Sequence, residues 1–160
     1  MPGWENFFMA QVGASASLAG LVFVGVSLNL NKIVSSGYLP NRAQEALLVL
    51  LMNLVLSLLF LVPGQTPASF GGQVLCGGLF TWGVIIWLHV DSFRRMDAAF
   101  RRRALTAAIL GQVMAALITA SGGELLLRGA PGVYWLVPGM LLTYFVALAN
   151  AWVLAVEINR

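Results

Sequence analysis

The side chains that could do chemistry in this sequence are few, and most of them are amides and hydroxyls. Asn53 and Ser57 lie one helical turn apart in a Leu-rich stretch, and Asn150 lies in a second apolar stretch. An amide in an apolar membrane helix usually finds a hydrogen-bond partner on a neighbouring helix. We therefore interpret Asn53, Ser57 and Asn150 as buried polar residues that join helices, with contact to a solute or ion as the alternative.

The sequence offers no recognisable set of catalytic or metal-binding residues. His89 is the only histidine and Cys76 the only cysteine, which excludes a bis-histidine haem within one chain and a multi-cysteine metal site. We find no HExxH motif, no Ser-His-Asp set and no glycine-rich phosphate loop. No carboxylate lies deep in an apolar stretch, so we expect no proton coupling through a buried acid. We expect a protein that is not an enzyme and that binds no cofactor and no metal.

The composition places the chain in a lipid bilayer. Hydrophobic residues make up 59% of it and charged residues only 9%, whereas a soluble domain carries about 25% charged residues. Five apolar stretches are long enough to cross a hydrocarbon core of about 30 Å, namely residues 7–30, 46–62, 70–90, 104–127 and 133–156. We predict an all-α transmembrane bundle that forms a single domain over residues 1–160. The fourth stretch is the least hydrophobic, so four spans with a re-entrant segment are the alternative.

The basic residues are distributed unequally between the two sides of such a bundle. With five spans, one side holds only Arg128, and the other side holds Lys32, Arg42, Arg94, Arg95, Arg101, Arg102, Arg103 and Arg160. Loops rich in Lys and Arg remain in the cytoplasm. We expect a multi-pass membrane protein with the N-terminus outside and the C-terminus in the cytoplasm. The net charge of +3 does not indicate nucleic acid, because the basic residues cluster between two spans.

The connection over residues 91–103 carries the strongest charge signal. Phe93, Met96 and Phe100 share one face of the helix that its charge spacing favours. Five arginines accompany them, namely Arg94, Arg95, Arg101, Arg102 and Arg103. Each can contribute roughly 1 kcal/mol of attraction to an anionic membrane surface. We therefore expect contact with anionic lipid headgroups, with control of topology alone as the alternative.

The first span carries small and polar residues at a regular spacing. Gly13, Ser17, Gly20, Val24, Ser27 and Asn31 recur every three or four residues, which is the period of a left-handed helix seam. Helices in membranes associate through close approach at small residues. The seam predicts a helix surrounded by protein, and three arrangements fit. The span is central in its own bundle, meets copies of itself around an axis or pore, or contacts a different membrane protein. Serines that bond to the carbonyl four residues back would weaken the case for a pore.

Four segments of the N-terminal part carry a resemblance. They are Trp4 with Phe7 and Phe8, GASASLAGLVFVGVSLNL, LPNRAQEALLVLL, and the Leu-rich span that ends in VPGQ. Together they resemble a group of small bacterial integral membrane proteins of unknown function, over about the first 65 residues. The resemblance implies a bacterial inner-membrane location and no particular activity.

These observations favour a homo-oligomeric channel or permeation protein whose first helix lies near the axis. An accessory or scaffold subunit that packs against another membrane complex is the alternative. A small-solute transporter is less favoured, because the sequence lacks coupling residues and an inverted repeat. The expected partners are the bilayer and either further copies of the chain or another membrane protein.

The charge asymmetry makes a prediction about topology. A reporter fused after Arg160 should score as cytoplasmic, and a reporter fused before Trp4 should score as external. If both ends score on the same side, the number of spans is even.

Overall fold

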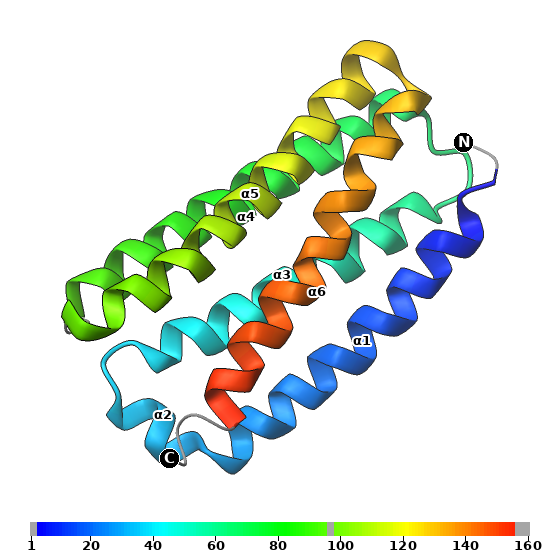
Figure 1. The fold of residues 1–160 in the computed structure, drawn as a ribbon. Helices are drawn as coiled ribbons and strands as arrows, with labels where there is room; N and C mark the ends of the chain where they lie inside the picture. Colours follow the sequence, from blue (N-terminus) through cyan, green and yellow to red (C-terminus); the bar gives the residue numbers. More distant parts are fainter. Residues whose placement is uncertain (1–2, 96–97, 156–160) are drawn as a thin grey trace.

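The computed structural model describes residues 3–95 and 98–155, except for the side chains of residues 98–104. The described chain is helical throughout, apart from short connections (Figure 1). The elements are α1 (Glu5–Leu28), α2 (Leu30–Ser35), α3 (Leu39–Phe60), α4 (Pro67–Arg95), α5 (Ala98–Arg128), the short 3-10 helix η1 (Ala130–Gly132) and α6 (Val133–Ala155).

Five of these helices, α1, α3, α4, α5 and α6, are long and apolar enough to cross a membrane. The prediction of an all-α bundle with five spans is confirmed. The four-span alternative is wrong, because α5 is one continuous helix of 31 residues that runs through Gly122 and Gly123. The beginning of α1 and the end of α6 lie at opposite ends of the bundle, as five crossings require (Figure 1).

The boundaries of two spans differ from their predicted positions, and the differences change where Glu45 and Asn31 lie. α3 begins at Leu39 rather than at residue 46, and Pro40 lies in its first turn, where a missing N–H costs nothing. This earlier start brings Glu45 inside the helix. α1 ends at Leu28 rather than at residue 30, so Asn31 lies on α2, beyond a break at Asn29.

The centre of the bundle is α3, not α1. α3 packs against α1, α4 and α6, while α1 lies on one side of α3 and α6 and the α4–α5 pair lies on the other (Figure 1). Ten residues of α3 are buried inside the bundle, compared with four residues of α1. The expectation that the first span would be the central helix is therefore wrong.

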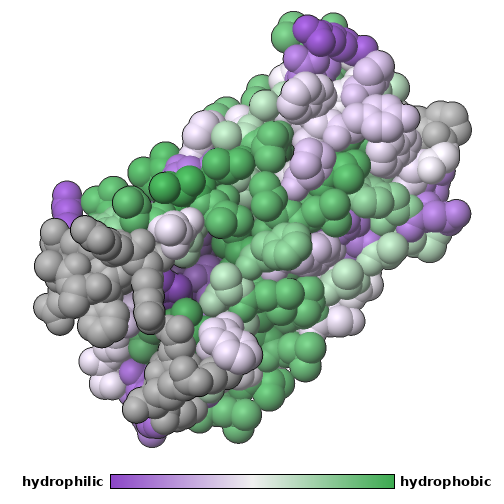
Figure 2. All heavy atoms as spheres, viewed as in Figure 1, coloured by the Kyte–Doolittle hydropathy of each residue, from purple (hydrophilic) through white to green (hydrophobic). Residues whose placement is uncertain are grey.

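The outer surface is apolar along most of its length. Figure 2 shows hydrophobic residues over the middle of the bundle and hydrophilic residues gathered at its two ends. Large side chains exposed on this surface include Phe23, Phe80, Phe145 and Trp152. An apolar belt of this kind matches a hydrocarbon environment and would be unfavourable in water. The fold is that of a polytopic integral membrane protein.

Close packing of α4 on α5 depends on glycines. A Cβ atom at Gly122 would lie 2.5 Å from the backbone N of Leu75, and one at Gly71 would lie 2.8 Å from Cβ of Leu125. Gly78 is similarly close to Thr119, at 2.8 Å from its Oγ1. Small residues let two membrane helices approach until their backbones touch, which maximises dispersion contact where burial of apolar surface gives little.

Two adjacent glycines of α5 provide a matched test of this packing. Gly122→Ala should lower the free energy of unfolding by about 1–3 kcal/mol, because the added methyl group overlaps the α4 backbone. Gly123→Ala meets no atom within 4 Å and should be neutral or slightly stabilising, because Ala is the better helix former. Thermal unfolding of both variants in mild detergent measures the difference. Equal melting temperatures would mean that α4 and α5 do not approach this closely.

Candidate functional site

The small and polar face of α1 points away from the bundle. Gly13, Ser17, Gly20, Val24 and Ser27 are all exposed, and a Cβ atom at Gly13 or Gly20 would meet nothing within 4 Å. We call these five residues the α1 outer face. Within one chain, the predicted seam is therefore uncovered. Asn31 is also exposed, but it belongs to α2.

The hydroxyl of Ser27 has its hydrogen bond inside α1. Its Oγ donates to the backbone carbonyl of Phe23 at 2.8 Å, the carbonyl four residues back. Asn29, at the end of the helix, similarly donates to the carbonyl of Gly25 at 3.2 Å. These groups do not need water as a partner, so the structure gives the wetted-pore form of the hypothesis no support at Ser27.

The opposite face of α1 carries Gln11 and Ser15, which accept hydrogen bonds from the amide of Asn53 on α3. Asn53 is 1% exposed, and its Nδ2 donates to Oε1 of Gln11 at 3.2 Å and to Oγ of Ser15 at 3.1 Å. The hydroxyl of Tyr144 on α6 also donates to Gln11 Oε1. Ser57 donates to the backbone carbonyl of Asn53 at 2.7 Å, within α3. Asn53 and Ser57 are thus buried, and Asn53 links α3 to α1 as expected for a residue that joins helices.

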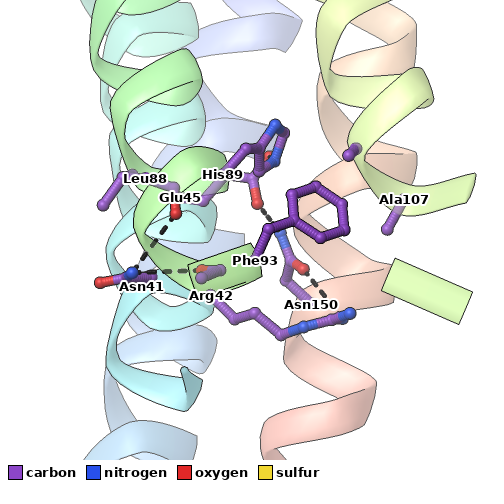
Figure 3. Close-up of a pocket in the computed structure, with 10 residues that line it drawn as sticks. Asn41, Arg42, Glu45, Leu88, His89, Phe93, Ala107 and Asn150 are labelled. Carbon is purple, nitrogen blue, oxygen red and sulfur yellow. Dashed lines mark hydrogen bonds and ion pairs between the residues drawn. The ribbon is translucent and has the colours of Figure 1, made fainter. Parts of the chain in front are cut away.

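Asn150 belongs to a second group of polar residues near the opposite end of the bundle, where four helices meet. Its centre is Glu45, which is 4% exposed. Oε1 of Glu45 lies 3.1 Å from Nε2 of His89, and Oε2 accepts a hydrogen bond of 3.1 Å from Nδ2 of Asn150. Figure 3 shows Arg42, Glu45, His89 and Asn150 directed into one pocket. With Gln112 and Trp82 they form what we call the Glu45 cluster.

The hydrogen bonds between α4 and α5 fix the tautomer of His89. The indole Nε1 of Trp82 can only donate, and it donates to Oε1 of Gln112 at 2.6 Å. The Nε2 amide of Gln112 must then be the group that faces Nδ1 of His89, at 3.1 Å. An amide NH2 is a donor, so Nδ1 accepts and the ring proton resides on Nε2. That N–H points at the carboxylate of Glu45.

A second chain of donors reaches Glu45 from α3 and α6. The guanidinium of Arg42 can only donate, and its Nη1 lies 3.4 Å from Oδ1 of Asn150. This contact orients the amide of Asn150 so that its NH2 group points at Glu45. Glu45 therefore faces two N–H donors, one on each carboxylate oxygen, which is the arrangement that an ionised carboxylate requires.

The backbone of α5 covers the Glu45–His89 pair at Gly111. A Cβ atom at Gly111 would lie 2.9 Å from Oε1 of Glu45 and 3.2 Å from Cε1 of His89. Only glycine lets α5 approach the pair this closely. The result is a low-dielectric setting, in which hydrogen bonds to a charged group are stronger than in water.

A small cavity adjoins the cluster on the side of the basic helix ends. Its volume is about 20 Å³, enough for about one water molecule, and its lining includes Asn41, Arg42, Glu45, Ser92 and Asn150. Beyond the cavity, Nδ2 of Asn41 donates to Oδ2 of Asp91 at 2.8 Å. The cavity gives the carboxylate a route to the end of the bundle.

The arginines expected at the membrane surface lie partly within the described residues. Arg94 and Arg95 are exposed at the end of α4, and Arg95 pairs with Asp91 at 2.9 Å. The side chains of Arg101, Arg102 and Arg103 lie outside the described part of the chain. Binding of anionic headgroups by these arginines stays a prediction.

Sequence reasoning missed the Glu45 cluster, because the predicted second span begins after Glu45, whereas the structure buries Glu45 inside α3. The predicted second span begins at residue 46, with the first uninterrupted run of apolar residues, and so leaves Glu45 just outside it. The missed signal is Pro40, a residue that favours the first turn of a helix and so moves the start of α3 ahead of Glu45. The partner of His89, Gln112, comes from a different helix, and the sequence does not give the register between the two helices.

Comparison with protein-family models, with curated proteins and with solved structures finds no match to this chain. Among the described residues, no three His, Cys, Asp or Glu side chains are grouped to hold a metal ion. The Glu45 cluster consists of a carboxylate, an imidazole, a guanidinium, an indole and two amides, next to a cavity for one water molecule.

Proposed function

We propose that this protein is a permeation protein of the bacterial inner membrane that works as a homo-oligomer, with α1 at the contact between subunits. The observation that carries the proposal is the exposure of the α1 outer face. A lipid-facing helix is expected to present large apolar side chains, whereas this face presents two glycines, two serines and a single valine. Small residues at this spacing serve helix contacts in membranes.

The composition of the α1 outer face favours a second copy of the chain as the occupant. The α1 outer face carries no charged group, so its partner needs no complementary charge. Small residues on both helices allow the two backbones to approach closely, which a helix with large side chains would prevent. The repeat of three and four residues is also the period at which two helices of equal pitch wind around each other.

The size of the interior cavities supports a path between subunits and not through one subunit. The cavity at Glu45 measures about 20 Å³, and the cavity lined by Thr81 and Thr143 measures about 10 Å³. Each suits one water molecule at most. A solute larger than water does not fit either of these two cavities, and the axis of an oligomer would offer it a wider path.

An accessory or scaffold role is the second candidate, and it rests on the same exposed face. In that case the α1 outer face packs against a helix of a different membrane protein. The two candidates differ in what lies opposite Gly20 in the membrane, which cross-linking can decide.

Cysteine cross-linking tests whether α1 meets its own copy. The native Cys76 is exposed on α4 and serves as an internal control, because a cysteine facing lipid should not form dimers. In native-like membranes, Cys76→Ser combined with Gly20→Cys should give a disulfide-linked dimer on mild oxidation, while the wild-type protein stays monomeric on a denaturing gel. Absence of the dimer from the Gly20→Cys protein, with the cysteine still reactive toward a lipid-soluble maleimide, would contradict the homo-oligomer.

A second variant separates loss of contact from loss of fold. Gly20→Leu adds a side chain where the single bundle has open space, so the monomer should melt as the wild type does. The oligomer should shift toward smaller species in mild detergent, because the backbones can no longer approach. A lower melting temperature with unchanged oligomer size would place a neighbour from the same chain at Gly20 and would contradict the proposal.

A further inference from the structure

We propose that the Glu45–His89 pair is a proton-binding site, and that the bound proton resides on Nδ1 of His89 and is signalled to Trp82 by rotation of the Gln112 amide. The site is separate from the α1 outer face, so the proposal does not rest on an oligomer. It rests on the direction of the hydrogen bonds in the Glu45 cluster.

Without the extra proton, every hydrogen bond of the chain Trp82–Gln112–His89–Glu45 runs in one direction. Trp82 donates to Gln112, Gln112 donates to His89, and Nε2–H of His89 donates to the carboxylate of Glu45. The first donor in this chain is a group that cannot accept, and the last acceptor is an anion. The chain is therefore complete only when Nδ1 of His89 carries no proton, because Nδ1 must accept from Gln112.

A proton added at Nδ1 turns His89 into a donor at both nitrogens. The imidazolium keeps its N–H toward Glu45, and the contact becomes a hydrogen-bonded ion pair, which is stronger in a buried setting. The new N–H at Nδ1 now faces the NH2 group of Gln112, which is also a donor. Rotation of the amide by half a turn presents Oε1 to His89 and removes this conflict.

The rotated amide then conflicts with Trp82. Its NH2 group would face the indole N–H at the 2.6 Å contact that the oxygen occupied. The indole must lose its partner and move away from Gln112. Since Trp82 is on α4 and Gln112 is on α5, the proton binding at the pair is transmitted to the packing between these two helices.

The cavity at the basic end of the bundle adjoins the pair and has room for about one water molecule as a source of protons. Glu45 and His89 both line this cavity, together with Arg42 and Ser92. The charged groups around the pair are Arg42, on the same helix as Glu45, and Asp91 with Arg95 further along α4. α5 and α6 contribute only the amides of Gln112 and Asn150 among their described side chains. Arg42 contacts Asn150, which in turn donates to Glu45. The carboxylate can therefore form its ion pair with the imidazolium of His89.

The experiment uses the fact that His89 is the only histidine in the chain. Labelling the full-length protein with ring-¹⁵N histidine and indole-¹⁵N tryptophan, in lipid nanodiscs, gives imidazole NMR signals from His89 alone, beside the indole signals of five tryptophans. At pH 8 we expect a neutral ring with the proton on Nε2. On acidification Nδ1 should gain a proton, and the Trp82 indole signal should move, over the same pH range, to the position of a hydrogen-bond-free N–H.

Two variants test the coupling, and a third serves as the control. Gln112→Leu should leave the Trp82 indole signal insensitive to pH, while His89 still takes up its proton. Trp82→Phe removes the group that opposes amide rotation, so His89 should become doubly protonated more readily than in the wild type. Trp87→Phe, a lipid-facing tryptophan that is 63% exposed on the same helix, should behave as the wild type.

Three results would overturn the proposal. The first is a proton on Nδ1 at pH 8, which would mean that the hydrogen bonds run the other way. The second is a Trp82 signal that stays fixed while His89 titrates in the wild type. The third is an unchanged titration of His89 in the Trp82→Phe variant that matches the Trp87→Phe control.

Discussion

The structure depends on one constraint, which is that a carboxylate buried among apolar helices must be supplied with hydrogen-bond donors. Burial of an isolated ionised carboxylate would cost many kcal/mol. A buried carboxylate is tolerated only when hydrogen-bond donors satisfy its oxygens. Glu45 obtains one donor from α4 and one from α6, and each of these donors is itself oriented by a further residue. The requirements of a single side chain therefore fix how α3, α4, α5 and α6 meet at one end of the bundle.

Different kinds of contact hold the helices together at the two ends of the bundle. Near Glu45, polar side chains specify the partners of each helix. Further along α4 and α5, glycines such as Gly78 and Gly122 allow backbone contact, and dispersion forces hold the pair together. α1 is attached to this body through Asn53 and its amide contacts, and it leaves its small residues uncovered. A helix attached on one face and bare on the other is suited to contact with another chain, which is the basis of the proposed oligomer.

Composition was enough to predict the fold class, because five apolar stretches in so short a chain have few alternatives to a five-helix bundle. Helical periodicity also predicts that Gly13 and Gly20 share one face of α1, and the structure shows both of them exposed. The position of α1 in the bundle was not predictable in the same way. Small residues indicate a close neighbour, but they do not say whether that neighbour belongs to the same chain. The Glu45 cluster was missed because its partners are 44 and 105 residues away, and the register between helices is set by packing and not by local sequence.

The most direct test of the central claim is the ionisation state of Glu45. Infrared difference spectra of the wild-type protein and the Glu45→Gln variant, both in lipid at neutral pH, isolate the band that this one side chain contributes. The account predicts that the variant loses the stretching bands of an ionised carboxylate, and that no band of a protonated carboxyl group disappears with them. Loss of a protonated carboxyl band would contradict it, because the proton would then reside on Glu45 and the imidazolium of His89 would have no anion to pair with.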